Sequence, residues 1–159
     1  MRKLFLTLCL GLSLLIFPFW LTNHQPAMAA VNSQTATADV YLPEAIDNFL
    51  TSLPSNYYIL TKIEALKSIV KNDNALLIDV RKPAEYASGH IPNAINIPLQ
   101  TLTKNLDKIP KNRPVVLYCT TGYRTAMGVM SLQILGYSNV RGFPPSIQGW
   151  KTAGEPLEK

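Results

Sequence analysis

One short segment places a strand, a loop and a helix in immediate succession around a cysteine. The unbroken apolar run at 115–118 is rich in β-branched and aromatic residues and predicts a buried strand that ends before Cys119. Gly122 can adopt a left-handed backbone conformation, and the apolar spacing that follows Arg124 predicts a helix. The residues of its predicted apolar face are Ala126, Met127, Val129, Met130, Leu132, Ile134 and Leu135. This order gathers loop N–H groups and the positive end of a helix around one sulfur atom.

Cys119 is therefore a candidate nucleophile. A helix N-terminus and a neighbouring cation both lower the pKa of a cysteine thiol, and Arg124 supplies a permanent positive charge close by. The alternative is an inert, buried cysteine at the end of a strand. The local pattern supports the nucleophile and the inert cysteine equally, so the surrounding residues are needed to distinguish them.

Short apolar runs alternate with helical patterns along the rest of the chain. Five strands are expected, at 57–60, 75–80, 94–97, 115–118 and 139–141. Unalternating runs such as 75–80 are typical of strands buried on both faces, so we predict an α/β fold: a five-stranded parallel sheet with helices on both faces. In such sheets reactive groups collect beyond the carboxyl ends of the strands, where Cys119 and Arg81 both fall.

The N-terminal segment has the features of a secretory signal. Arg2 and Lys3 are followed by an apolar run at 4–21 and an A-x-A cleavage site at 27–29. The expected organisation is a signal peptide or N-terminal anchor at 1–29, a flexible tether at 30–41, an N-terminal helix extension at 42–57 and one domain at 58–159. We therefore expect an exported protein, in a periplasm or a thylakoid lumen, that touches a membrane only if the signal is retained.

Loss of the signal leaves a mildly basic chain with one cysteine. The net charge of +5 becomes +3, because Arg2 and Lys3 are lost with no acidic residue, and no basic run remains to indicate a nucleic-acid partner. Cys9 leaves with the signal, so Cys119 is the single cysteine of the mature chain and no internal disulfide is expected. One cysteine and one histidine, His90, do not provide a zinc site of the usual kind, so no metal and no cofactor is expected.

Three separated motifs resemble the single-domain rhodanese family. The first, at 77–98, is L-I-D-V-R-x-P-x-E-Y-x-x-G-H-I-P-x-A-x-N-I-P. The second is C-x-x-G-x-R at 119–124, and the third is G-Y-x-N-V at 136–140, ahead of Trp150. The resemblance covers residues 58–157, and it is specific because the motifs occur in the right order and spacing.

The resemblance implies a rhodanese-like domain that transfers sulfur without a cofactor. Cys119 would accept a sulfane sulfur from a donor such as thiosulfate, form a persulfide and pass the outer sulfur to cyanide or a thiol, with ping-pong kinetics. The loop residues that would cradle the persulfide are Thr120, Thr121, Gly122, Tyr123 and Arg124. Arg81 and Arg124 would bind the anionic donor and stabilise the leaving sulfite.

Three further polar residues in the motifs are expected to support the site structurally. Sulfur transfer needs little proton movement, so Asp79 and Glu85 are expected to orient Arg81 and the loops. His90 is expected to tie its turn to the sheet. Many family members carry Gly-Gly where this chain has Pro145-Ser146, which leaves acceptor access and specificity open.

Other functions use a similar cysteine loop. Cysteine phosphatases need five residues between the cysteine and the arginine, whereas four residues, 120–123, make a smaller cradle that fits one sulfur better. A slow or non-catalytic carrier of sulfane sulfur, or a partner-docking module, is the alternative from a different class. A reductase needs a resolving cysteine, which the predicted mature chain does not contain.

Overall fold

The computed structural model describes residues 41–159, and the predicted signal and the tether up to residue 40 lie outside this range. The helices are α1 (Leu42–Thr51), α2 (Ile63–Asn72), α3 (Pro83–Ala87), α4 (Tyr123–Ile134) and α5 (Ser146–Thr152), with two 3-10 helices, η1 (Leu99–Lys104) and η2 (Leu106–Lys108). Within the described range no helix has the length and apolar character needed to span a membrane.

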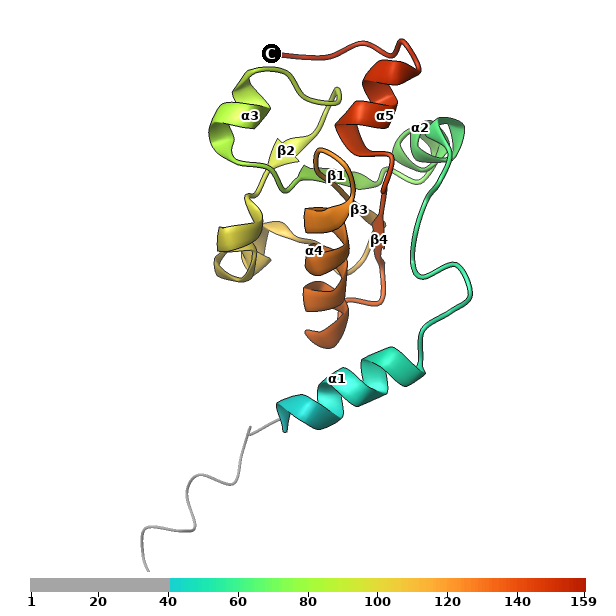
Figure 1. Cartoon of the computed structure of the whole chain (residues 1–159), viewed down its shortest axis with the longest axis vertical. Helices are drawn as coiled ribbons and strands as arrows, with labels where there is room; N and C mark the ends of the chain where they lie inside the picture. The colour runs from blue at the N-terminus through green and yellow to red at the C-terminus, as the bar shows by residue number, and fades with distance from the viewer. Residues whose placement is uncertain (1–40) are drawn as a thin grey trace, which may run out of the picture. The chain divides into compact units, whose positions relative to one another are not determined.

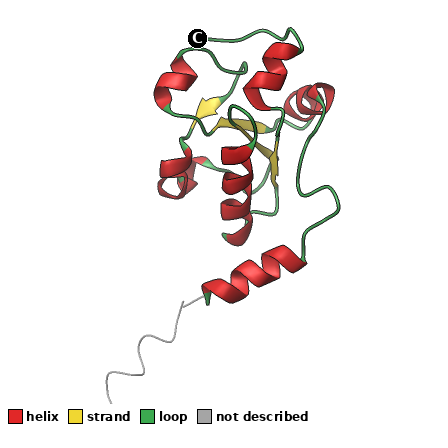
Figure 2. Cartoon of the chain, in the orientation of Figure 1, coloured by secondary structure: helices red, strands yellow, loops and turns green. Residues whose placement is uncertain are grey.

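A parallel sheet forms the centre of the domain. Its strands are β1 (Leu76–Asp79), β2 (Ile95–Asn96), β3 (Val115–Tyr118) and β4 (Val140–Gly142), in the order β2-β1-β3-β4. All three pairings are parallel, and Ile78 of β1 lies opposite both Ile95 and Leu117. The α/β class and the parallel sheet are confirmed, and Figure 2 shows the strands with helices around them.

The predicted fifth strand at 57–60 is wrong. Only Ile59 pairs with the sheet, through an isolated parallel bridge to Gly142. Tyr57 and Tyr58 have φ values of 46° and 54°, in the left-handed region that an extended strand excludes. The run therefore makes two backbone hydrogen bonds to Gly142, from the Leu60 N–H and to the Tyr58 carbonyl, but it does not continue as a strand.

Each face of the sheet has its own apolar core. Successive side chains of a strand point to opposite faces, so Leu117 and Val116 of β3 belong to different clusters. Leu117 shares its cluster with Leu132 of α4, whereas Val116 shares its cluster with Leu66 of α2 and Trp150 of α5. Helices thus cover both faces, and Figure 1 shows α4 separated from α2 and α5.

The N-terminal extension contributes one helix to the described domain. Phe49 of α1 is buried, and its ring stacks on that of Tyr58 with a centroid separation of 6.5 Å. α1 also contacts α4, which carries the first residues after the cysteine loop. The extension therefore packs on the domain near the element that begins at the loop.

The predicted apolar face of α4 is partly wrong, because Met127 is 59% exposed. The buried side of α4 consists of Thr125, Gly128, Val129 and Leu132. A Cβ atom at Gly128 would lie 2.6 Å from Cδ2 of Leu117, so the helix approaches β3 at this glycine. The buried positions have the helical spacing i, i+3, i+4 and i+7, which leaves Met127 on the exposed side; a threonine and a glycine on the buried side hide this pattern from an analysis of apolar residues.

A second close approach, at Gly142, gives a test of this packing. A Cβ atom there would lie 2.8 Å from Cγ2 of Thr125 and 3.3 Å from Cγ2 of Val129. Both neighbours are buried and β-branched, so they have little freedom to rotate away. We expect Gly142→Ala to lower the free energy of unfolding by about 1–3 kcal/mol in urea titrations.

The control is Arg141→Ala, which removes an exposed side chain from the same strand and should change that free energy by less than about 0.5 kcal/mol. Equal midpoints for Gly142→Ala and the unmodified protein would contradict the close packing of α4 on β4.

Candidate active site

Cys119 directly follows β3 at the carboxyl edge of the sheet, and its side chain is 1% exposed. Its carbonyl oxygen accepts the N–H of Ile147 from α5 at 3.1 Å. Its Sγ accepts the N–H of Gly122 at 3.1 Å. The loop therefore turns back over the sulfur before α4 begins, as the sequence predicts.

Gly122 is needed at this turn for two reasons. Its φ of 100° lies in the region that favours glycine. A Cβ atom at this position would also lie 3.1 Å from the carbonyl oxygen of Pro144. The loop thus depends on a residue without a side chain to bring its N–H group to the sulfur.

The surroundings of the Cys119 sulfur favour the thiolate. Burial alone would raise the pKa of the thiol, because it removes water from the charged form. The nearby Thr125 hydroxyl and the N–H groups of Thr125, Gly122 and Thr121 outweigh burial and lower the pKa to about 7. The thiolate, which is the reactive form of a cysteine, is therefore more accessible near neutral pH than for an ordinary thiol.

Arg124, Glu85 and Thr120 form a clamp across the loop. The Arg124 guanidinium donates to both carboxylate oxygens of Glu85, at 2.8 and 2.9 Å, and to the Thr120 hydroxyl at 2.8 Å. Thr120 in turn donates to Glu85 at 3.2 Å. The hydrogen bond from Arg124 lowers the pKa of Glu85 to about 2, and the same pair raises the pKa of Arg124. Glu85 therefore holds Arg124 and the loop, not Arg81.

Arg81 is engaged elsewhere. Its guanidinium donates to both carboxylate oxygens of Asp79, at 2.6–3.0 Å, and to the carbonyl of Gly89 at 2.9 Å. Arg81 and Asp79 are 5% and 0% exposed. Asp79 thus orients Arg81 as expected, but the guanidinium is committed to buried acceptors. The role of Arg81 in donor binding stays a prediction that these contacts do not favour.

His90 has contacts that fit a structural role. Its ring stacks on Tyr86 at 3.7 Å between centroids, and its backbone pairs with Glu158 of the C-terminal tail. Figure 1 accordingly shows the C-terminal end of the chain close to α3. Within residues 41–159 no cluster of three or more His, Cys, Asp or Glu side chains is arranged to hold a metal ion.

Two hydroxyl groups beside the sulfur escape sequence analysis. Thr125 Oγ1 is buried and makes no hydrogen bond among the described residues, and its hydroxyl is near enough to the Cys119 sulfur to lower the pKa of the thiol. A hydroxyl residue in the first helical turn after the loop is a signal that could have indicated it. Ser146 Oγ lies 3.8 Å from Sγ of Cys119 and comes from α5, 27 residues away. No local pattern indicates that contact.

A cavity of about 220 Å³ opens beside the clamp. Its lining residues are Val80, Lys82, Pro98, Leu99, Gln100 and Arg124. Val80 follows β1, and Leu99 donates its N–H to the carbonyl of Val80, so this wall belongs to the carboxyl edge of the sheet. The cavity thus brings the exposed Lys82, which the sequence did not single out, next to Arg124.

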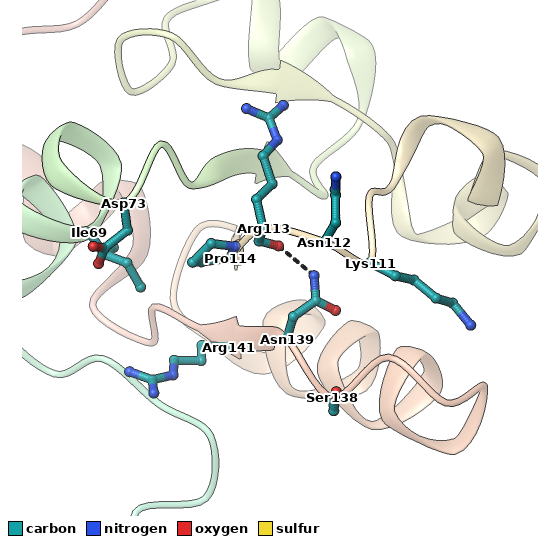
Figure 3. A pocket seen from close by; sticks show the side chains of 9 residues that line it. All are labelled: Ile69, Asp73, Lys111, Asn112, Arg113, Pro114, Ser138, Asn139 and Arg141. Carbon is teal, nitrogen blue, oxygen red and sulfur yellow. Dashed lines mark hydrogen bonds between the residues drawn. The ribbon is translucent and has the colours of Figure 1, made fainter.

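Another cavity, of about 440 Å³, lies at the amino ends of β3 and β4 (Figure 3). Its cationic residues are Lys111, Arg113 and Arg141, and Figure 3 shows their side chains extending in different directions. Asn139 donates to the carbonyl of Arg113 and ties the two turns together. The cations therefore do not converge on one point as an anion site requires.

Comparison with known proteins gives one consistent family. The family described as Rhodanese-like domain matches residues 62–153, more than half of the chain. A protein named sulfurtransferase from Allochromatium vinosum is 35% identical over 89 residues, which cover 56% of this chain and 83% of that protein. The putative sulfur carrier protein YrkF of Bacillus subtilis is 30% identical over 89 residues, covering 55% of this chain and 48% of that protein.

Solved structures agree with this assignment. The crystal structure of a rhodanese-related protein from Thermoplasma volcanium has a TM-score of 0.58 at 28% identity and covers 64% of this chain and 98% of that one. The chain thus spans most of the named sulfurtransferase but about half of the putative carrier. The fold, the loop around Cys119 and these matches lead to one conclusion: the chain belongs to the family of proteins with a rhodanese-like domain.

Proposed function

We propose that the protein is a sulfurtransferase that carries a sulfane sulfur on Cys119. The observation that carries this proposal is the loop between β3 and α4, whose Gly122 N–H donates to Sγ of Cys119 at 3.1 Å, and the lowered pKa of the thiol agrees with it. A thiolate is the nucleophile that opens a sulfane S–S bond. The likeness to a named sulfurtransferase supports the same assignment.

In the first half-reaction the Cys119 thiolate attacks the outer sulfur of a donor such as thiosulfate. The S–S bond of the donor breaks, its electron pair leaves with sulfite, and Cys119 keeps the transferred sulfur as a persulfide anion. The N–H of Gly122, 3.1 Å from Sγ, belongs to a group of donors that can hold anionic sulfur.

In the second half-reaction a thiolate or cyanide attacks the outer sulfur of the persulfide. The S–S bond to Cys119 breaks, its electron pair returns to Sγ, and the product leaves as a persulfide or as thiocyanate. Neither half-reaction requires a general base, because a thiolate acts as the nucleophile in the first step and is released in the second. The clamp of Glu85 and Arg124 then has a positioning role.

The charges at the cavity favour an anionic donor. Glu85 neutralises Arg124, and Asp79 neutralises Arg81. Lys82 has no ion-pair partner among residues 41–159, so it adds an uncompensated positive charge to the cavity wall. A dianion such as thiosulfate is attracted to that charge more strongly than a neutral donor.

Phosphatase activity is less well supported by the loop. Four residues separate Cys119 from Arg124, and the guanidinium donates to both oxygens of Glu85. A phosphoryl group needs donors around three oxygens, including an arginine free to bind two of them. A single transferred sulfur needs only the N–H groups around Sγ.

A sulfur carrier is the second candidate. The likeness to a putative sulfur carrier protein favours it, as does the burial of Sγ, which limits the approach of large acceptors. In that role Cys119 would hold the persulfide until a specific partner removes it, with little turnover on small donors.

We further propose that the protein acts outside the cytoplasm, in a periplasm or a thylakoid lumen, because residues 1–29 have the pattern of a secretory signal. The intact mass of the chain purified from its own host reports whether cleavage occurs after Ala29. A mass that includes residues 1–29 would contradict the cleaved form and leave membrane attachment through that segment.

Replacement of Cys119 tests the covalent step. Cys119→Ser keeps the size of the side chain but not its thiolate, so thiocyanate formation from thiosulfate and cyanide should fall by roughly a thousandfold or more. Sulfite release followed in parallel should show that thiosulfate cleavage is lost too. The control is Ser131→Ala, which removes a hydroxyl from α4 away from the sulfur.

The same assays separate an enzyme from a carrier. Intact mass after incubation with thiosulfate should show one added sulfur in the unmodified protein and none in Cys119→Ser. A stable added sulfur with negligible turnover would favour the carrier. Normal turnover by the serine variant would contradict both roles of Cys119.

The cavity charge makes a separate prediction. Lys82→Gln should raise the KM for thiosulfate about threefold at low ionic strength, because one favourable charge interaction is lost, and added salt should remove the difference. The KM for a neutral organic trisulfide should not change. Lys71→Gln, which removes the same charge from α2, is the matched control, and an equal effect there would show that only net charge matters.

A further inference from the structure

Ser146 occupies a position where a side chain is costly. It is the fully buried first residue of α5, and its φ of 52° lies in the left-handed region. A glycine adopts this conformation freely, whereas other residues are strained by roughly 1–2 kcal/mol. The strain has to be offset by contacts of the serine hydroxyl.

The hydroxyl is surrounded by the backbone and the sulfur of the reactive cysteine. Ser146 Oγ accepts the N–H of Cys119 at 3.1 Å. It lies 3.0 Å from the carbonyl oxygen of Phe143 and 3.8 Å from Sγ of Cys119, and both can accept its hydrogen. The single hydroxyl hydrogen therefore has two alternative acceptors, and only one of them changes its charge during the proposed reaction.

We propose that Ser146 stabilises Cys119 as the leaving group when the persulfide is discharged. This inference rests on the proposed persulfide and adds a role for one residue in the second half-reaction. In the persulfide the negative charge lies mainly on the outer sulfur, so the hydroxyl donates to the Phe143 carbonyl. As the charge returns to Sγ, the hydroxyl rotates and donates to the sulfur.

The bonds balance without a proton transfer. The acceptor thiolate forms a bond to the outer sulfur while the bond between that sulfur and Sγ breaks. The electron pair of the broken bond stays on Sγ, and the acceptor leaves as its persulfide. The Ser146 O–H keeps its hydrogen throughout and changes only its acceptor.

Ser146 acts on the inner sulfur because its oxygen is anchored there. The hydrogen bond from the Cys119 N–H fixes Oγ beside Sγ, whereas the loop N–H groups can also donate to the outer sulfur of the persulfide. Arg124 is the charged group that also acts on the Cys119 sulfur, and its pair with Glu85 is independent of Ser146. The effect of the hydroxyl can thus be measured with the other groups in place.

The test uses Ser146→Gly and Ser146→Ala in the full chain. Both variants lose the hydroxyl, but the glycine also relieves the strained backbone, so an effect shared by both belongs to the hydroxyl. The rate of alkylation of Cys119 by iodoacetamide, measured against pH, gives the thiol pKa without any sulfur transfer. We expect both variants to have a higher pKa, with about 3–10 times less thiolate at pH 7.

The second measurement is the discharge of protein loaded with one sulfur by excess thiol, expressed per loaded Cys119 so that unfolded protein does not count. We expect discharge about 3–10 times slower in both variants, and an unchanged rate in Ser131→Ala. Unchanged discharge in the two Ser146 variants overturns the leaving-group role, even if the thiol pKa rises.

The inference and the proposed function fail in different ways. If the unmodified protein takes up no sulfur from thiosulfate, polysulfide or an organic persulfide, the proposed function fails. The pH profile of alkylation still tests the hydrogen bond from Ser146 to Sγ. An equal thiol pKa in the unmodified protein, Ser146→Gly and Ser146→Ala would overturn that bond.

Discussion

The proposed reactivity of the domain depends on a cysteine thiolate that forms in a buried position. Burial opposes ionisation of Cys119, yet the Thr125 hydroxyl and several loop N–H groups lower its pKa to about 7. These donors converge only because β3 ends one residue before the sulfur and α4 begins four residues after it, with Gly122 in the left-handed conformation between them. The parallel sheet fixes both elements, so the reactivity of the thiol is a property of the fold more than of the residue type.

The charged residues around this site are mostly paired with one another. The pair of Asp79 and Arg81 is fully enclosed, and loss of either partner would leave a buried charge at a cost of about 3–5 kcal/mol. The pair of Glu85 and Arg124 is about one-third exposed and fixes the loop through Thr120. The guanidinium groups of Arg81 and Arg124, which the sequence predicts to bind the donor, therefore pair with carboxylates of the domain itself. The positive charge left over at the cavity is that of Lys82.

Sequence patterns predict the parts of the fold that depend on continuous apolar runs. Residues 75–80 and 115–118 form adjacent parallel strands, and the cysteine loop leads into α4 as expected. The run at 57–60 has the same composition, but two positive φ angles, which composition does not encode, limit it to one isolated bridge with Gly142. The predicted burial of Met127 is also wrong, because the buried side of α4 includes Thr125 and Gly128, which apolar spacing does not count. For the site, the motif gives Cys119 and its loop, whereas the hydroxyl contact from Ser146, 27 residues away, requires the tertiary structure.

A cysteine that is alternately nucleophile and leaving group faces opposing demands. Each hydrogen bond to Sγ raises the thiolate fraction and eases its departure, but it also lowers the intrinsic nucleophilicity of the sulfur. The best compromise for an attacking thiol is a pKa near the ambient pH, and the value of about 7 at Cys119 meets it. A hydroxyl that changes its acceptor as the charge moves meets both demands. It can stabilise the thiolate as Cys119 leaves, without donating to Sγ in the other states of the reaction. Ser146, with two acceptors for one hydrogen, has the geometry for that task.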